Sequence, residues 1–265
     1  MSLEALRTAV PELGLADLPV MVHSGLRAHE PAIDANDLLD ALLEYGVTVM
    51  VPTFTYDCEC APPVGTTLPR NGEGPGHSQR RAETFDVSSR QLSLADMGQF
   101  PASVLARTGR ARGDHPLNSF TAIGPLAADL VTSQTAEDVY APLRALIERN
   151  GRVLMANTDL RSLTLVHLAE SVAGRNLFIR WSPDADGKPQ PVRVGSCSAG
   201  FLALETAVSE IVTEARVCGR RWWSMSARDG VEQLADAIRM NPQITHCGRE
   251  TCARCRDACL GGPPN

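Results

Sequence analysis

The chain has 265 residues, of which 43% are hydrophobic and 21% are charged, the balance of an ordinary globular domain. Its formal net charge of −6, without a basic run interleaved with aromatic residues, argues against a nucleic acid partner and suits a cationic small-molecule substrate. No apolar run approaches the roughly 18 residues of a membrane-spanning helix, and the first residues lack the pattern of a signal peptide, so we expect a soluble, cytoplasmic protein without a membrane partner.

The N-terminal part of the sequence predicts a strand–helix–strand unit. Residues 18–22 form an apolar run that is typical of a buried strand. Leucines at helical spacing predict a helix across residues 38–43, with Asn36 or Asp37 as its cap. Residues 47–51 form a second buried strand. This order predicts a βαβ unit and a parallel sheet.

The middle of the chain alternates between loop and regular structure. Residues 57–81 are rich in proline and glycine and predict a long surface loop over a site. Helical patterning returns at residues 97–105, and residues 119–123 resemble a short strand. A helix is expected across residues 142–150, followed by a buried strand at residues 153–156.

The last third predicts a different arrangement. A helix is expected at residues 163–172, and two strand-like runs, 176–181 and 190–194, predict a hairpin. Two further helices are expected near residues 202–217 and 231–240.

Together these elements predict an α/β fold with a central, mostly parallel sheet and flanking helices. We expect a single domain over residues 1–265, in which residues 175–265 form a C-terminal subdomain.

His167 and Glu170 are the reactive pair that the sequence favours. Their i, i+3 spacing places both side chains on one face of a helix. A histidine with a pKa near neutrality can remove the proton from an ammonium group, and the carboxylate can orient the ring or hold a second ammonium of the substrate. The alternative is a helix-surface pair, but the apolar neighbours favour burial. A metal site here is a weaker interpretation, since the sequence has no second His-x-x-Glu.

Four of the eight cysteines lie between residues 247 and 259. The Cys252-x-x-Cys255 pair places two thiolates at one metal ion, so structural zinc is favoured over free thiols or an iron–sulfur cluster. The candidates for the remaining ligands are His246, Cys247, Cys259, Cys197 and Cys218.

Several polar segments follow predicted strands or turns. His23-Ser24-Gly25 ends the first strand, where small residues let backbone N–H groups approach a phosphate or a pantetheine arm. Arg112 is a candidate for a phosphate contact, with His115 and Ser119 as donors near a thioester. The alternatives are an ordinary strand-to-turn junction and a structural histidine in a turn.

Five segments in a fixed order carry a family resemblance. They are residues 22–27, 48–55, 112–116 with Ser119 and Gly124, 151–155, and 164–170. In this order they resemble the aminoglycoside 3-N-acetyltransferase family, and the cysteine pattern is similar to that of its apramycin-type members. The resemblance implies the antibiotic N-acetyltransferase fold, which is not the GCN5-type fold, with a zinc-pinned C-terminal segment. It also implies direct acetyl transfer from acetyl-CoA to an amine, without a covalent enzyme intermediate.

The resemblance also implies roles for individual residues. His167 is the general base, with Glu170 and Thr164 as the other catalytic residues. The implied contacts to coenzyme A are His23, Ser24, Gly25, Leu26, Arg112, His115 and Ser119. The implied zinc ligands are Cys197, Cys252, Cys255 and either Cys247, which we adopt, or His246. This chain departs from the family where Gly25 replaces a serine and where Gly113-Asp114 separates Arg112 from His115, with a negative charge at Asp114.

The acceptor is expected to be a small-molecule amine. Asp57 and Glu170 are the predicted contacts to a polycationic aminoglycoside, and Glu59, Glu83 and Asp86 in or beside the long loop are further acidic candidates, although all the loop acids could equally be solvated surface charges. The sequence therefore predicts an aminoglycoside or related amine N-acetyltransferase with a role in antibiotic resistance. The alternatives are a biosynthetic acyltransferase for another natural-product amine and a non-catalytic, zinc-stabilised binding module.

Overall fold

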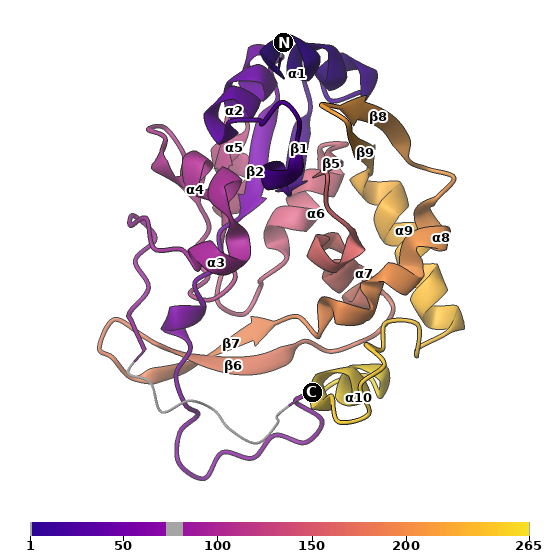
Figure 1. Ribbon diagram of the computed structural model, residues 1–265. Coiled ribbons are helices and arrows are strands. Elements are labelled where there is room, and N and C mark those ends of the chain that lie inside the picture. The colour runs from indigo at the N-terminus through magenta and orange to yellow at the C-terminus, as the bar shows by residue number, and fades with distance from the viewer. Residues whose placement is uncertain (1, 73–81, 265) are drawn as a thin grey trace.

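A central sheet with helices on both faces organises the molecule (Figure 1). The computed structural model describes residues 2–72 and 82–264, and within these ranges seven strands form the sheet. The strands are β1 (Pro19–Ser24), β2 (Thr48–Pro52), β3 (Ala111–Arg112), β4 (Phe120–Ile123), β5 (Arg152–Ala156), β8 (Thr213–Val217) and β9 (Arg220–Ser226). Their spatial order is β3-β4-β2-β1-β5-β9-β8.

Parallel strands occupy the centre of this sheet. β1 pairs in parallel with β2 on one side and with β5 on the other, so Val20 lies opposite both Val49 and Arg152. The predicted βαβ unit is therefore confirmed. Outside this centre the pairings β2–β4, β3–β4, β5–β9 and β8–β9 are antiparallel. The parallel strands deliver their carboxyl ends to one edge, and the antiparallel strands extend the sheet on either side.

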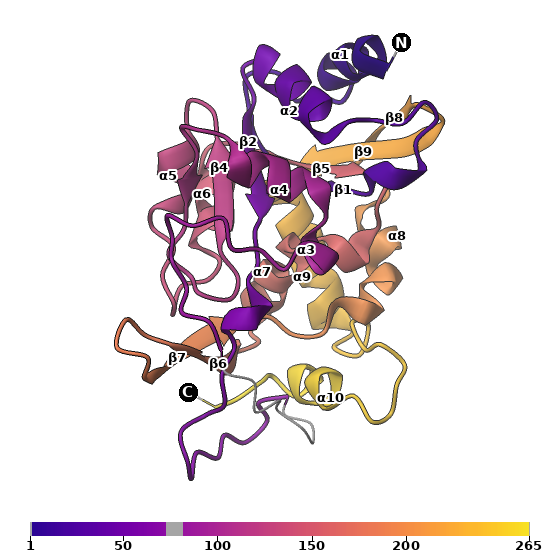
Figure 2. The ribbon, with the colours of Figure 1, turned by 60° about the vertical axis from the view of Figure 1, so that its left-hand side comes forward.

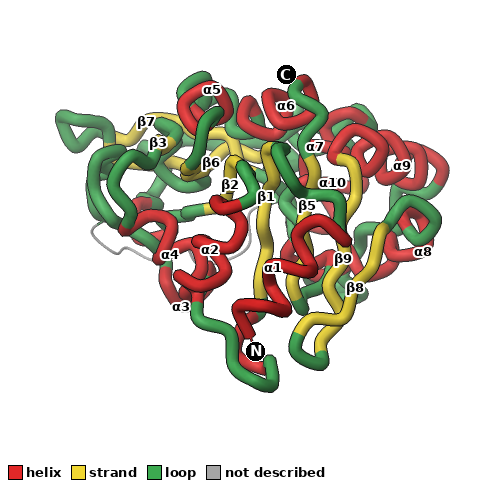
Figure 3. Tube along the Cα trace, turned by 90° about the horizontal axis from the view of Figure 1, so that it is seen from above, coloured by secondary structure: helices red, strands yellow, loops and turns green. Residues whose placement is uncertain are grey.

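Two apolar cores lie on opposite faces of the sheet, and the helices that cover each face lie on either side of the strands in Figure 3. One face packs against α1 (Ser2–Glu12), α2 (Ala35–Glu44) and α4 (Gln99–Ala106). The other packs against α5 (Ala127–Val131), α6 (Ala141–Glu148), α7 (Leu165–Val172) and α9 (Ala227–Met240). Successive strand residues alternate between these faces, so Val20 and Val22 enter the first core while Met21 enters the second.

The cap of α2 differs from the sequence prediction. The Asp34 carboxylate accepts hydrogen bonds from the backbone N–H groups of Asn36 (2.7 Å) and Asp37 (3.4 Å). Asn36 and Asp37 are thus the first-turn donors that a cap satisfies, and the prediction that one of them is the cap was wrong.

The predicted helix across residues 202–217 was also wrong. A 3₁₀ helix η4 (Ser198–Leu204) leads into the short α8 (Glu205–Val208), and β8 and β9 then join the edge of the sheet. Cys218 and Gly219 connect the two strands with φ values of 45° and 75°. Two consecutive positive φ angles form the tight hairpin turn that fits the twist of antiparallel strands.

The hairpin predicted downstream of α7 is confirmed. It consists of β6 (Phe178–Pro183) and β7 (Pro189–Val194), and it lies with α10 (Ala253–Cys259) at the end of the molecule opposite the N-terminus (Figures 1 and 2). The remaining helices described are α3 (Leu94–Met97), η1 (Leu26–Ala28), η2 (Tyr56–Cys58) and η3 (Leu160–Ser162). Within the predicted long loop, residues 73–81 lie outside the described residues. In the part of the chain that the structure describes, every helix is too short or too polar to cross a membrane.

Candidate active site

A cleft of about 590 Å³ opens at the carboxyl ends of the parallel strands. Ser24 ends β1, Pro52 ends β2, and Thr158 follows β5, and all three line the cleft. Ligands of open α/β sheets bind at this edge, because the loops that leave the strands diverge there and leave a hollow. The cleft is also lined by His167 from α7 and by residues 194–199, which run from the end of β7 into η4.

His167 and Glu170 form a hydrogen-bonded pair at the wall of this cleft. The ring Nδ1 of His167 lies 2.8 Å from Oε2 of Glu170. The His167 side chain lines the cleft and is 14% exposed, whereas the Glu170 side chain is 5% exposed and lies behind it. With Nδ1–H donated to the carboxylate, Nε2 keeps its lone pair, and this is the tautomer that a general base requires.

Glu170 is held as a carboxylate by three partners. The Ser196 hydroxyl donates to Oε2 over 2.6 Å, and Nη1 of Arg175 lies 2.5 Å from Oε1. Burial raises the pKa of Glu170, but the bonds from His167 and Ser196 and the charge of Arg175 outweigh burial and lower it. Glu170 lies next to His167, as the sequence predicts, but it does not line the cleft. The predicted contact between Glu170 and the substrate therefore has no geometric support.

Aromatic rings fix the plane of the His167 imidazole. Tyr140 stacks on it at 6.3 Å with an interplanar angle of 5°, and Phe201 meets it edge-on at 4.9 Å. Gly195 packs against the same ring, and a Cβ there would lie 2.7 Å from Cγ of His167. Thr164, the residue that precedes the first turn of α7, is buried and lines the cleft. The three predicted catalytic residues therefore lie together.

The predicted contacts to coenzyme A separate into two groups. His23 and Ser24 line the cleft at the end of β1. Burial lowers the pKa of His23 to about 3, so its ring is neutral, and its Nε2 has no hydrogen-bond partner among the described residues. Gly25 and Leu26 do not line the cleft. The Gly25 carbonyl accepts a hydrogen bond from Asn157 over 2.9 Å, and Leu26 packs against the core between the sheet and α1.

Arg112 and Ser119 lie outside the cleft-lining residues and are bonded to the protein itself. Nε of Arg112 donates to the Ser119 hydroxyl, and its Nη2 donates to the carbonyls of Thr53 and Gln91. Ser119 in turn donates to the Thr53 carbonyl over 2.8 Å. These buried bonds tie β2, β4 and the loop before α3 together, so their geometry supports an indirect role rather than a phosphate contact.

His115 is likewise committed to the fold. Its Nε2 lies 2.9 Å from the Arg193 carbonyl, and its Nδ1 accepts from the backbone N–H groups of Leu117 and Asn118. Burial lowers the pKa of His115 to about 4, which keeps the ring neutral and Nδ1 able to accept. The ring joins the turn before β4 to strand β7, and a direct contact of His115 with a ligand stays a prediction.

The acidic residues predicted to meet the acceptor are only partly at the cleft. Asp57 is exposed and does not line it, and the same holds for Glu83 and Asp86. Glu59 does line it, as does Asp96, which the sequence did not single out. The short helix η2 turns its residues in different directions, and a pattern of loop charges could not indicate which one faces inward.

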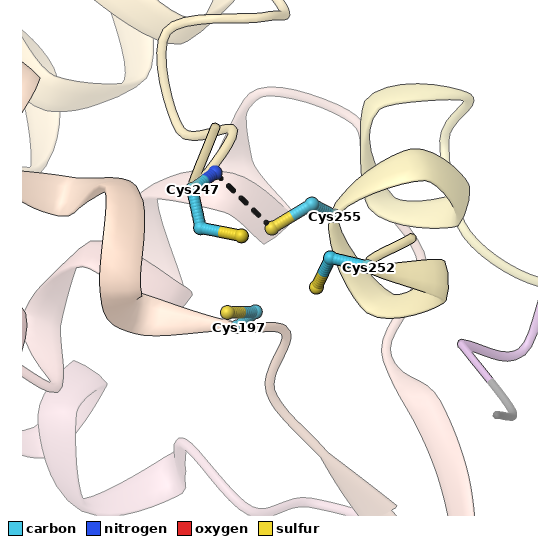
Figure 4. A group of neighbouring side chains, drawn as sticks. All are labelled: Cys197, Cys247, Cys252 and Cys255. Atoms are coloured by element: carbon cyan, nitrogen blue, oxygen red, sulfur yellow. Dashed lines mark hydrogen bonds between the residues drawn. The ribbon is translucent and has the colours of Figure 1, made fainter. Parts of the chain in front are cut away.

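Four cysteines form a compact cluster beside the cleft (Figure 4). The Sγ atoms of Cys197, Cys247, Cys252 and Cys255 all lie within 4.8 Å of one another. Tetrahedral zinc–thiolate bonds of about 2.3 Å place the sulfur atoms about 3.8 Å apart, so the four residues fit such an ion. The backbone N–H of Cys247 also donates to Sγ of Cys255 over 3.4 Å. His246 and Cys259 lie outside the cluster.

Ser196 connects the cysteine cluster to the His167–Glu170 pair. Cys197 itself lines the cleft, and it follows Ser196, the donor to Glu170. Arg254, between Cys252 and Cys255, lines the cleft as well. The cleft is also lined by polar residues that the sequence did not indicate as site residues, among them Tyr56, Asp96, Tyr140, Arg180, Ser196 and Arg254. They come from segments far apart in sequence, and only the serine beside a predicted ligand offered a local signal.

Comparison with known proteins agrees with this geometry. The family model described as aminoglycoside 3-N-acetyltransferase matches residues 21–238. Aminoglycoside N(3)-acetyltransferase VII of Streptomyces paromomycinus is 35% identical over 173 residues, which are 61% of this chain and 57% of that protein. The chain thus spans about half the length of the curated relatives it matches.

Solved structures show the same fold. Aminoglycoside acetyltransferase AAC(3)-IVa superposes with a TM-score of 0.74 at 21% identity, over 98% of this chain and 96% of that one. A binary complex of AAC-IIIb with CoASH superposes with a TM-score of 0.71 at 19% identity, over 91% of this chain and 97% of that one. The match of one family model to most of the sequence shows that this chain belongs to the aminoglycoside 3-N-acetyltransferase family.

Proposed function

We propose that the protein transfers an acetyl group from acetyl-CoA to an amine nitrogen of an aminoglycoside or a related compound. The observation that carries this proposal is the His167–Glu170 pair, which opens onto a cleft at the carboxyl ends of the parallel strands. The family relationship and the CoASH complex of a structural relative support acetyl-CoA as co-substrate.

The chemistry follows from the state of the pair. An acceptor ammonium loses a proton to Nε2 of His167, and Glu170, ionised and bonded to Nδ1, stabilises the imidazolium that results. The amine nitrogen then attacks the thioester carbonyl, and the nitrogen of the tetrahedral intermediate releases its second proton to solvent. The carbon–sulfur bond breaks, and the proton on His167 passes to the departing thiolate, so the amide, CoASH and one solvent proton form without a covalent enzyme intermediate. Burial raises the pKa of both Cys58 and Cys60, which makes them poor nucleophiles and agrees with direct transfer.

The hydroxyl-rich edge of the cleft suits the phosphates of coenzyme A. Ser24 ends β1, while Thr158, Arg161 and Ser162 line the cleft on the segment after β5. The parallel pairing of Ser24 with Ala156 brings these two segments side by side. Hydroxyl groups at strand ends can donate hydrogen bonds to the phosphates of such an arm. Thr164 and His23 also line the cleft, and the thioester would meet His167 there.

We further propose that the four-cysteine cluster binds structural zinc. Four thiolates leave no open coordination position, so the ion would fix the C-terminal segment against residue 197 and take no part in acetyl transfer. Thiolate ligands require reducing conditions, and acetyl-CoA is an intracellular metabolite, so we place the protein in the cytoplasm.

The test is product formation with purified protein, acetyl-CoA and a panel of aminoglycosides and simple amines. Chromatography should quantify CoA and the acetylated amine, since the eight cysteines would react with thiol reagents. We expect acetylation that falls by at least about 100-fold in His167→Gln, the loss typical of a general base. Acetyl-CoA binding without acetylation of any aminoglycoside would move the acceptor to another natural-product amine, and absence of acetyl-CoA binding would overturn the acyltransferase assignment. A non-catalytic binding module is disfavoured by the intact, hydrogen-bonded pair.

A further inference from the structure

The charges that line the cleft are not those expected around a polycation. The described residues contribute two carboxylates, Glu59 and Asp96, and three guanidinium groups, Arg161, Arg180 and Arg254. An aminoglycoside carries several ammonium groups, and the described lining lacks the excess of carboxylates that would attract such a ligand.

Two of these arginines are compensated by neighbouring carboxylates. Arg161 donates three hydrogen bonds from its side chain to the two carboxylate oxygens of Asp159. Nε of Arg180 lies 3.7 Å from Oε1 of Glu59, and its Nη1 donates to the backbone carbonyls of Asn71 and Ile179. Neither pair leaves a net charge for a ligand to meet.

Asp96 and Arg254 are the two charged lining residues that these pairs leave uncompensated among the described residues. Both are exposed, both line the cleft, and neither has an ion-pair partner within residues 2–72 and 82–264. Burial and the charge of Asp96 raise the pKa of Tyr56 to about 12, and the charge of Arg254 opposes this rise. Tyr56, Asp96 and Arg254 all line the cleft, so its described lining presents one unpaired anion and one unpaired cation.

We infer that the acceptor carries an anionic group, a carboxylate or a phosphate, in addition to its amines, and that Arg254 binds this group. This inference rests on the proposed acetyl transfer. A planar guanidinium matches two oxygens of a carboxylate or phosphate, and Asp96, which lines the same cleft, suits an ammonium of the same molecule. The flanking residues Cys252 and Cys255 belong to the cysteine cluster, which fixes the start of α10 and holds Arg254 at the cleft. An amino sugar or aminocyclitol with an acidic substituent has this chemistry.

The experiment compares acceptors that differ in charge. Acetylation of glucosamine, glucosamine 6-phosphate, glucosaminic acid and the polycation apramycin is measured by product chromatography at saturating acetyl-CoA. The variants are Arg254→Gln and Arg254→Glu. Arg256→Gln is the matched control, because Arg256 is exposed on the same helix and does not line the cleft. We expect kcat/KM for glucosamine 6-phosphate or glucosaminic acid to exceed that for glucosamine at least about tenfold, the effect of one charge-assisted contact. The phosphate and the carboxylate arms identify which anion is bound.

Arg254→Gln should reduce this ratio about tenfold, Arg254→Glu should shift preference towards apramycin, and Arg256→Gln should keep the wild-type ratio. Where no acceptor is turned over, calorimetry on the CoA complex must show the same order of affinities. The inference would be overturned if the wild type used all acceptors equally, preferred apramycin, or bound neither anionic amine. It would also be overturned if Arg254→Gln raised only the KM of acetyl-CoA. Failure of acetyl-CoA to bind the wild-type protein would instead overturn the proposed function itself.

Discussion

The hydroxyl of Ser196 lies 2.6 Å from Oε2 of Glu170, the same oxygen that faces the ring nitrogen of His167. The bond restrains the carboxylate in the orientation that accepts Nδ1–H, so Ser196 is a positioning residue for the base. We expect Ser196→Ala to lower kcat about tenfold with little change in the KM of acetyl-CoA, and to move the acidic limb of the kcat–pH profile. Steady-state kinetics between pH 5 and pH 9 would measure both effects.

Two variants make this prediction specific. Ser196→Thr keeps a hydroxyl and should recover part of the rate, whereas Ser209→Ala removes an exposed hydroxyl on the other side of α8 and should leave kinetics unchanged. A loss in Ser196→Ala that is confined to KM, or an unchanged pH profile, would argue against positioning.

Gly195 leaves room for the imidazole of His167. A Cβ at residue 195 would lie 2.5 Å from the Tyr140 hydroxyl and 2.7 Å from Cγ of His167, distances that side chains do not tolerate. Gly195→Ala should therefore displace the ring, lower kcat by roughly 10- to 100-fold and cost only about 1–3 kcal/mol of stability. Thermal unfolding together with kinetics checks this, and an active variant with wild-type kcat would show that the ring position is not critical.

The sequence could predict those parts of the molecule that depend on local spacing. Apolar runs identified the central strands, and the i, i+3 spacing identified His167 and Glu170 as neighbours on one helix face. The sequence prediction was wrong at residues 202–217, where a helical and a strand-like apolar pattern follow each other without a break. Phe201, Leu204 and Val208 recur at helical spacing and are buried, but Ala215 and Val217 continue the apolar pattern as a strand.

The remainder of the site depends on contacts between distant segments. Arg112 has the residue type of a phosphate ligand, yet carbonyls from two other loops satisfy it. Tyr56, Ser196 and Arg254 reach the cleft from three separate regions, and no spacing rule relates them. Cys197 was one of five candidate partners of the Cys-x-x-Cys pair, and the family resemblance selected it for the four-cysteine cluster, because such a pair does not specify its distant partners.

The cysteine cluster makes a prediction that separates the alternative ligand sets. Cys255→Ser should lower bound zinc from one equivalent to below about half and reduce thermal stability, because three ligands and a serine hold zinc far less tightly. Cys259→Ser is the matched control in the same run of cysteines, and it should keep full zinc, since Cys259 lies outside the cluster. Metal analysis of the purified proteins by mass spectrometry gives the stoichiometry. Wild-type protein without zinc, or equal zinc loss in Cys259→Ser, would refute this ligand set.

The buried ring of His115 should make the free energy of unfolding depend on pH. Burial lowers its pKa to about 4, below the ordinary value near 6.5, so between these limits the unfolded chain binds a proton that the folded chain does not. The contribution of His115 to stability is therefore complete above pH 6.5 and is lost as the pH falls towards 4, by about 1.4 kcal/mol per pH unit. Protonation would also deprive the N–H groups of Leu117 and Asn118 of their acceptor. Urea unfolding at pH 7, 6 and 5 should show a falling free energy of unfolding, with a slope smaller by about one proton in His115→Gln. His115→Gln should also be less stable than the wild type at pH 7. If its free energy of unfolding changed with pH at the same slope as that of the wild type, His115 would be protonated in the folded protein.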